Sequence, residues 1–241
     1  MNQQSLTIMQ QLHLHGMYYA FENLLSSKQH THLTPDELLG MLLQAEWEDR
    51  QHKKLQHLIR SAHFRYQASL EEINFPPSRN LDKNTLLRLS DCSYIERKEN
   101  ILITGPTGVG KSYIASALGH QACYKGFKTV YFNMQKLFPK LALAKADGSY
   151  IREMQKIEKK ELLIIDDFGM TTLDADRRME LMEIIEDRHG RNSTIICSQL
   201  PVNKWYEVIG ESTIADAILD RTINGAHRLE LKGDSLRKKD V

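Results

Sequence analysis

Cysteine is scarce in this sequence, whose 241 residues include only Cys92, Cys123 and Cys197. The three lie far apart, form no C-x-x-C pair, and two of them fall in apolar segments. We therefore expect buried free thiols, and neither disulfides nor zinc ligands. The lack of a disulfide framework fits a reducing compartment, so we expect a cytoplasmic protein.

A strong excess of charge of either sign is also absent, because 32 lysines and arginines face 31 aspartates and glutamates. This balance excludes a polybasic tail or an acidic solvating chain, so any contact with nucleic acid has to come from local patches. No basic stretch leads into an apolar one at the N-terminus, and no apolar run has membrane-spanning length. We expect neither export nor a membrane partner.

The chain is long enough for one core of about 150 residues and a smaller appended region. Pro76 and Pro77 cannot continue a helix, because proline lacks the backbone donor and holds the preceding residue extended. We place a domain boundary there, between a helical N-terminal domain (1–75) and an α/β domain (76–241).

The N-terminal domain is predicted to contain two helices. Apolar residues at helical spacing predict one helix from Leu6 to Ser27, with a kink at Gly16. A second helix begins at Thr34, because Thr34 and Glu37 form a capping box and Pro35 stands in the first turn. Its apolar period continues to about Phe64.

Basic residues collect in two helical segments. The stretch from Arg50 to Tyr66 contains no carboxylate, and the segment from Met134 to Lys160 is rich in lysine. Either surface can bind DNA phosphates, although a solvated charged face explains a charge run equally well. The candidate DNA-binding residues are Arg50, Lys53, Lys54, Arg60 and Arg65, and Lys136, Lys140 and Lys145.

The clearest motif is a phosphate-binding loop, G-x-x-x-x-G-K-[ST], from Gly105 to Ser112. A short apolar strand precedes it and an amphipathic helix follows, which is the context that this motif requires. We expect Lys111 to reach the β- and γ-phosphates of ATP and Ser112 to ligate Mg²⁺. The expected nucleotide-binding residues are Gly105, Pro106, Thr107, Gly108, Val109, Gly110, Lys111, Ser112 and Tyr113.

A second motif is an apolar strand that ends in two carboxylates, Asp166 and Asp167. Ligands bind beyond the carboxyl ends of parallel strands, so both side chains should emerge beside the phosphates. We expect Asp166 to hold Mg²⁺ through its water shell and Asp167 to polarise the attacking water. Related ATPases more often use glutamate at the second position, so a shorter side chain indicates slow hydrolysis or a switch. Gln199, at the end of another predicted strand, is placed to contact the γ-phosphate or this water.

Five segments predict strands, at 100–104, 128–132, 162–165, 193–198 and 227–231, and helical patterns separate them. This alternation predicts an α/β fold with a parallel sheet flanked by helices.

Taken together, these stretches resemble the IstB-like family of AAA+ helper ATPases, which are encoded beside the transposase in one class of bacterial insertion sequences. The family is related to the bacterial helicase loader and replication initiator. The resemblance covers nearly the whole chain and is carried by Leu14–Met17, Ala45–Glu48, Gly105–Ser112, Asp147–Tyr150, Asp166–Gly169, Ser198–Val202, Thr213–Arg221 and Glu230–Arg237.

The resemblance implies an AAA+ P-loop ATPase that self-assembles with ATP on duplex DNA without sequence preference and stimulates a transposase. It also implies that Arg221 is an arginine finger for a neighbouring subunit and that Arg237 is a second sensor arginine, with Arg188 and Arg191 as other finger candidates. Only ten residues follow the last predicted strand, too few for a full helical lid.

Three other functions remain open. A replicative helicase loader would share the core and prefer single-stranded DNA. A small-molecule kinase could use the same phosphate loop, but the sequence contains no lid insertion or acceptor-binding residues. A non-catalytic, ATP-gated adaptor would tolerate the change of Asp167 to Asn.

Overall fold

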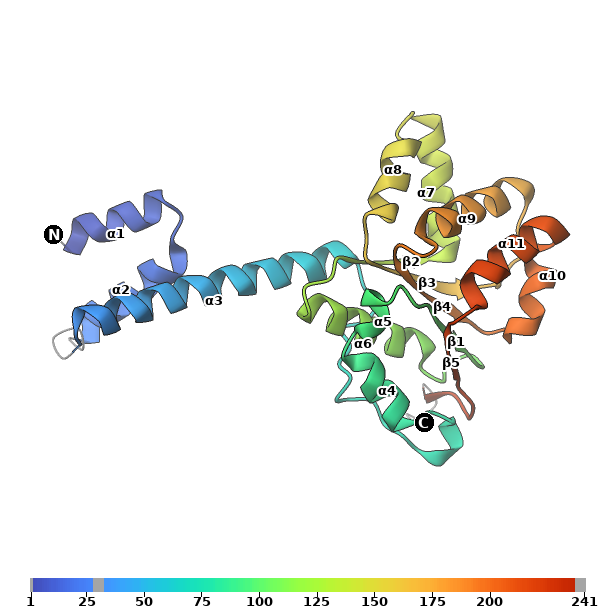
Figure 1. Cartoon of the computed structure of the whole chain (residues 1–241), viewed down its shortest axis with the longest axis horizontal. Coiled ribbons are helices and arrows are strands. Elements are labelled where there is room, and N and C mark those ends of the chain that lie inside the picture. The colour runs from blue at the N-terminus through green and yellow to red at the C-terminus, as the bar shows by residue number, and fades with distance from the viewer. Residues whose placement is uncertain (1, 28–32, 237–241) are drawn as a thin grey trace. The chain divides into compact units, whose positions relative to one another are not determined.

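The computed structural model describes residues 2–27 and 33–236 (Figure 1). Its contacts divide the chain into two compact units, and the division falls between His57 and Leu58, inside a helix. No helix among the described residues combines the length and the apolar character needed to cross a membrane.

The first unit contains α1 (Asn2–Gln11), α2 (His15–Ser27) and most of α3 (Pro35–Ala62). The single helix predicted from Leu6 to Ser27 is wrong, because His13 adopts a left-handed φ of 57° between α1 and α2. Gly16 does not bend a helix but allows α2 to approach α3 closely. A Cβ at Gly16 would lie 2.3 Å from the backbone oxygen of Ala45.

The predicted capping box at the start of α3 is confirmed. The Thr34 N–H donates to Glu37 Oε2 (2.8 Å), and the Glu37 N–H donates to Thr34 Oγ1 (3.3 Å). These bonds satisfy donors that have no partner within a helix. The helix ends at Ala62, because His63 has a left-handed φ of 56°.

The second unit is built on a five-stranded, all-parallel sheet with strand order β2-β3-β4-β1-β5. The strands are β1 (Ile101–Thr104), β2 (Thr129–Asn133), β3 (Leu162–Phe168), β4 (Ser193–Ser198) and β5 (His227–Glu230), at the five predicted positions. β2, β3 and β4 lie on one side of β1, and β5 lies on the other. Such a reversal of strand order places a ligand site at the carboxyl end of β1.

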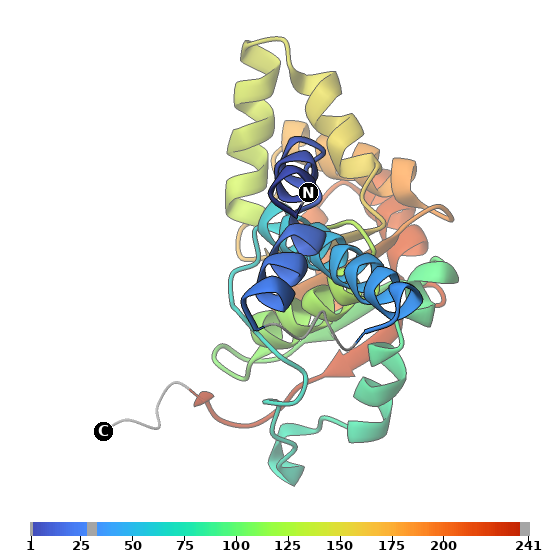
Figure 2. The same ribbon diagram turned by 90° about the vertical axis from the view of Figure 1, so that its left-hand side faces the viewer.

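Helices cover both faces of this sheet. They are η2 (Pro77–Arg79), α4 (Lys83–Ser90), α5 (Ser93–Glu96), α6 (Lys111–Tyr124), α7 (Met134–Ala146), α8 (Tyr150–Glu158), α9 (Ala175–Arg188), η3 (Val202–Lys204), α10 (Trp205–Ile209) and α11 (Ser212–Ile223). Figure 2 shows α7 and α8 as a helical hairpin. Alternate residues of β1 to β4 enter two cores, so that Ile101 and Ile103 pack with α6 while Leu102 packs with α7, α9 and α11.

The chain between α3 and η2 packs on the α6 face of the sheet. Ala68 and Ile73 are buried in that core, and Phe64, Tyr66 and Leu70 pack against it. These contacts place residues 58–75 with the second unit, so the division of the chain lies earlier than the predicted boundary at 75/76.

All three cysteines are free and buried, as predicted. Burial raises the pKa of the Cys92 thiol to about 12. Burial also raises the pKa of Cys197 well above its usual value, and the nearby Asp166 acts in the same direction. These thiols are therefore protonated at neutral pH and fill space in the core.

Candidate nucleotide-binding site

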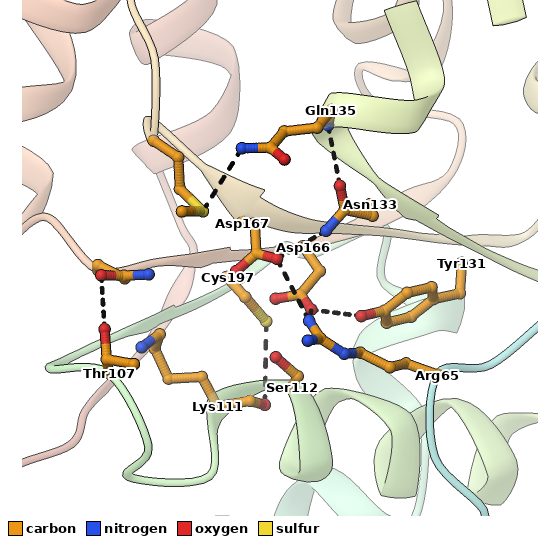
Figure 3. A network of polar contacts seen from close by, with 12 residues as sticks. Arg65, Thr107, Lys111, Ser112, Tyr131, Asn133, Gln135, Asp166, Asp167 and Cys197 are labelled. Atoms are coloured by element: carbon orange, nitrogen blue, oxygen red, sulfur yellow. Dashed lines mark hydrogen bonds and ion pairs between the residues drawn. The ribbon is translucent and has the colours of Figure 1, made fainter. Parts of the chain in front are cut away.

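The two predicted motifs meet at the carboxyl ends of β1, β3 and β4 (Figure 3). There they line a cavity of about 540 Å³ together with residues 65–79, which precede the first strand. Its lining includes Arg65, Tyr66, Ile73, Arg79, Thr107, Gly108, Gly110, Lys111, Ser112, Tyr113, Asp167, Gln199 and Leu236. Tyr113 thus lies where it was predicted, beside the loop.

The phosphate loop depends on glycine at its three glycine positions. Gly108 and Gly110 adopt left-handed φ values of 86° and 94°. A Cβ at Gly105 would lie 2.3 Å from the backbone oxygen of Leu231, and one at Gly108 would lie 2.0 Å from Ser235 Oγ. The chain after β5 therefore packs directly on this loop, and the Leu236 N–H donates to the Gly108 oxygen (3.0 Å).

Lys111 and Ser112 open α6 directly after the loop. Lys111 is buried, and its Nζ donates to the backbone oxygens of Gly105 and Pro106, each at 2.7 Å. The helix N-terminus and the ammonium group make this end of the loop favourable for phosphate. Figure 3 shows the Ser112 hydroxyl on the side of the loop that faces Asp166.

Asp166 is fully buried at the end of β3. Its Oδ2 accepts hydrogen bonds from the Tyr131 hydroxyl and from Arg65 Nη1 (3.3 Å). Burial raises the pKa of Tyr131, and the carboxylate of Asp166 raises it further, so the hydroxyl stays a donor. Asp166 Oδ1 is buried and has no hydrogen-bond partner among the described residues. A buried carboxylate oxygen without a partner fits a magnesium ion or its water shell.

Asp167 has a different backbone conformation and a more open position. Its φ is 60°, and the β3–β4 register shifts between Ile165 and Phe168. A left-handed aspartate within a strand is strained, and the bulge redirects its side chain toward the cavity. Its Oδ2 accepts from Asn133 Nδ2 (2.6 Å) and from Arg65 Nη1 (3.2 Å).

Gln199 and Thr107 meet across the opening of the cavity. Gln199 directly follows β4, and its Oε1 accepts a hydrogen bond from Thr107 Oγ1 (2.7 Å). The contact joins the phosphate loop to the end of β4. Gln199 is therefore placed where the sequence pattern predicted it, within the nucleotide cavity.

Arg221 lies at the opposite end of the strands. Its backbone oxygen accepts from Asn100 Nδ2 (3.2 Å), and Asn100 precedes β1. Its Nε lies 2.6 Å from Glu186 Oε2 on α9. Arg221 is not among the residues that line the nucleotide cavity, and Arg237 lies outside the described residues.

Of the other finger candidates, Arg188 is excluded. It is buried and donates to Thr194 Oγ1 (3.1 Å) and to the backbone oxygens of Ile157, Lys160 and Ser193. These bonds hold α9, β4 and the end of α8 together. Arg191 is exposed, and its Nη1 lies 3.8 Å from Glu158 Oε1.

The predicted basic patches are partly neutralised by carboxylates one turn away or on a neighbouring helix. Arg50 pairs with the buried Glu46 and Lys53 with Asp49, each at 2.7 Å. Lys140 and Lys145 pair with Glu153 and Glu180, also at 2.7 Å. Within the described part of the chain, Lys54, Arg60 and Lys136 have no ion pair within 4 Å.

Arg65 was predicted to bind DNA, and the structure places it elsewhere. Its Nη1 contacts both Asp166 and Asp167 in the nucleotide cavity (Figure 3). This arginine lies three residues beyond the end of α3, where the chain has turned onto the core. Helical periodicity cannot predict its direction, because the helix has already ended.

Three further residues were missed by the sequence analysis. Tyr131 and Asn133 point to the carboxylates from β2, whose Asn133 pairs in register with Asp166. A polar residue at the end of a predicted strand was the available signal. Arg79 is buried and donates from Nε to the Val109 oxygen (3.1 Å), which fixes the phosphate loop from behind. Burial lowers the pKa of Arg79. No sequence pattern marked Arg79.

Solved structures share this fold. The chain superposes on the crystal structure of DnaI with a TM-score of 0.60 at 17% identity, over 73% of this chain and 94% of that one. AMPPCP-bound DnaA from Aquifex aeolicus gives a TM-score of 0.61 at 16% identity, over 71% and 52% of the two chains. At this level of identity the likeness concerns the fold alone.

Sequence relatives are closer. The chain is 45% identical to the insertion-sequence ATP-binding protein y4pL of Sinorhizobium fredii, over 93% of this chain and 92% of that protein. It is 28% identical to the ATP-binding protein of insertion sequence IS21 of Pseudomonas aeruginosa, over 97% and 88%. The sequence-family model described as IstB-like ATP binding protein matches residues 7–241 of this chain. The chain therefore belongs to the IstB-like family of ATP-binding proteins.

Proposed function

We propose that this protein is a magnesium-dependent ATPase that assembles on duplex DNA without sequence preference and stimulates the transposase of an insertion sequence in the cytoplasm. The observation that carries the proposal is that the phosphate loop, Asp167 and Gln199 line one cavity, with the buried Asp166 next to Asp167 at the end of β3. The names of its relatives support the link to insertion sequences.

The positions of these side chains support the proposed hydrolysis. The loop N–H groups and Lys111 would bind the phosphates, and Ser112 and Asp166 would hold Mg²⁺, whose charge would offset that of the phosphates. Asp167 accepts the proton of the attacking water, and Gln199 orients that water. Asp167 is already engaged with Asn133 and Arg65, which favours slow turnover.

The position of Arg221 favours an assembly. Phosphate loop and Arg221 stand at opposite ends of the parallel strands, so Arg221 is remote from the site of its own subunit. In the proposed oligomer it stabilises the developing charge in a neighbour, which ties hydrolysis to assembly. Arg237 is proposed as the second sensor arginine.

DNA contact is proposed through the basic residues of α3, namely Arg50, Lys53, Lys54 and Arg60, and through Lys136, Lys140 and Lys145. Contacts to phosphates supply affinity without reading sequence. Arg65 is withdrawn from this set because it pairs with the carboxylates of the nucleotide site.

Fluorescence anisotropy of labelled duplex and single-stranded DNA, with ATP or ADP at one fixed salt concentration, tests the proposal. We expect tight binding to duplex DNA with ATP only, equal for unrelated sequences. A preference for single strands would favour a helicase loader. Binding that does not depend on the nucleotide would contradict ATP-driven assembly.

A further inference from the structure

The side chain of Arg65 bridges the two carboxylates that the proposed function assigns to Mg²⁺ and water. Its Nη1 lies 3.3 Å from Asp166 Oδ2 and 3.2 Å from Asp167 Oδ2. One nitrogen thus lies between oxygens of two adjacent carboxylates. Figure 3 shows the guanidinium reaching this point from the side opposite the phosphate loop.

The backbone on both sides of Arg65 is fixed. Phe64 packs against His120 with ring centroids 4.4 Å apart, and a Cβ at Gly119 would lie 2.4 Å from the Phe64 ring. On the other side, the Tyr66 oxygen lies 3.1 Å from His120 Nε2. Both contacts are made to α6, the helix that begins with Lys111 and Ser112. The backbone at Arg65 is therefore held against α6, the helix that directly follows the phosphate loop.

The guanidinium and a divalent cation have the same electrostatic reason to bind there. Two carboxylates side by side repel each other, and a cation between them removes that repulsion. Asp166 Oδ1, which lacks a partner among the described residues and fits Mg²⁺ or its water shell, belongs to the same carboxylate as the Oδ2 that Arg65 contacts, so a Mg²⁺ ion there would lie beside the guanidinium. Repulsion between the two cations also disfavours joint occupation.

The contact of Arg65 is weak enough to be exchanged. Charge-assisted hydrogen bonds are commonly about 2.7–2.9 Å long, and both Arg65 contacts exceed this. About a third of the side chain is exposed, so a released guanidinium can be solvated. Tyr131 and Asn133 bond to the same Asp166 and Asp167 oxygens from β2, so they hold the carboxylates in position whether or not Arg65 is bound.

We propose that Arg65 is an internal counter-cation that competes with Mg²⁺ for Asp166 and Asp167 and so sets the magnesium concentration at which the site becomes competent. The inference rests on the proposed function, since that function assigns the carboxylates to Mg²⁺. Arg65 is accordingly a positioning residue: it acts through the two carboxylates and controls access of the metal to them.

The test uses Mg²⁺ alone, with no nucleotide, and follows the thermal unfolding midpoint of the full chain. In the wild type we expect Mg²⁺ to have little effect, because Arg65 already neutralises the carboxylates. In Arg65→Gln the uncompensated carboxylates bind Mg²⁺, and millimolar Mg²⁺ should raise the midpoint by about 3 °C. Arg152→Gln, which removes an exposed arginine on α8, should behave as the wild type.

A second measurement follows the affinity for a fluorescent ATP analogue as Mg²⁺ is titrated. The Mg²⁺ concentration that gives half of the change in affinity should be about tenfold lower in Arg65→Gln than in the wild type. In Arg65→Lys, which keeps a cation, it should fall by less. The lysine variant also covers the case in which Arg65→Gln does not fold. Equal Mg²⁺ responses of the Arg65 variants and the wild type in both measurements would overturn the inference.

The two proposals can fail separately. If the wild type does not bind nucleotide, the proposed ATPase is contradicted. The Mg²⁺ measurement without nucleotide would still test the role of Arg65. Intact ATP binding with unchanged Mg²⁺ responses would contradict only the role of Arg65.

Discussion

Adjacent aspartates at the end of β3 have different surroundings, and the difference supports the separate roles proposed for them. Asp166 is fully buried with one oxygen lacking a partner, whereas Asp167 is turned to the cavity by a left-handed backbone. A buried, fixed carboxylate suits a metal or its water shell. A more open carboxylate with room for a water molecule suits a general base.

This difference predicts the behaviour of Asp167→Asn. We expect ATP binding within about twofold of the wild type and hydrolysis lowered about 100-fold or more, since an amide cannot accept the proton. A phosphate-release assay beside equilibrium binding measures both. Asp176→Asn, an exposed position in α9, is the control. Unchanged turnover in Asp167→Asn would support the non-catalytic adaptor.

The phosphate loop predicts a sharp effect for Gly108→Ala. Gly108 has a φ of 86°, which alanine rarely adopts, and the added methyl group would clash with Ser235. The loop therefore has to deform. We expect nucleotide affinity to fall at least tenfold, measured by calorimetry. Gly40→Ala is the contrasting control, because among the described residues no atom outside the surrounding turns of α3 lies within 4 Å of the new methyl group, and alanine favours a helix. Retained affinity in Gly108→Ala would mean that the loop tolerates the methyl group.

At the scale of elements, α6 connects the nucleotide site with the segment after α3. His120 on α6 contacts Phe64 and the Tyr66 oxygen, on either side of Arg65. Burial lowers the pKa of His120, despite the opposing effect of the Tyr66 oxygen. The folded protein therefore keeps this imidazole neutral in a pH range in which the unfolded chain is already protonated.

This shift predicts an acid-sensitive contribution to stability. Below about pH 6.5 the unfolded chain binds the proton first, so the free energy of unfolding falls as the pH decreases. In His120→Gln this contribution disappears, so the loss of stability between pH 7 and pH 5 should be smaller than in the wild type. Urea unfolding at several pH values measures it. The same pH dependence in His120→Gln and in the wild type would contradict the assignment to His120.

At the scale of the whole molecule, the proposed DNA contact can be separated from nucleotide binding. Changing Lys53 and Lys54 together to Glu should weaken duplex binding at least tenfold at fixed salt and leave ATP affinity intact. The control is a second double variant, with Lys83 and Lys125 changed to Glu, which alters the net charge equally but on exposed positions of the second unit. Circular dichroism checks α3, because the change at Lys53 replaces its ion pair with Asp49 by two like charges one turn apart. Equal DNA affinity of both double variants would remove α3 as the contact.

The proposed assembly predicts complementation between inactive subunits. Arg221→Ala and Lys111→Ala should each lose most ATPase activity, the first in the neighbour's site and the second in its own. An equimolar mixture should regain part of the activity, because a Lys111→Ala subunit can supply Arg221 to an intact site. Arg191→Ala should remain active. No recovery in a mixture whose subunits co-assemble would argue against action in trans.

Sequence patterns predicted the parts of the fold that depend on near neighbours. The Thr34 capping box, the five strands and the glycine turn at residues 105–110 all involve residues a few positions apart, and the structure contains all three. The patterns failed where local propensity was overridden. His13 breaks the first helix in a conformation uncommon for histidine, and residues 58–75 join the core through contacts to α6.

The sequence alone thus determined the nucleotide loop, the carboxylate pair and the α/β class, because each is written in a short run of residues. The tertiary structure decided what surrounds the carboxylates. Arg65 reaches Asp166 across 101 positions, and Tyr131 and Asn133 reach the pair from β2. Those contacts depend on strand order and on where the chain turns after α3. Neither has a local signature, because both follow from packing between elements that are distant in sequence.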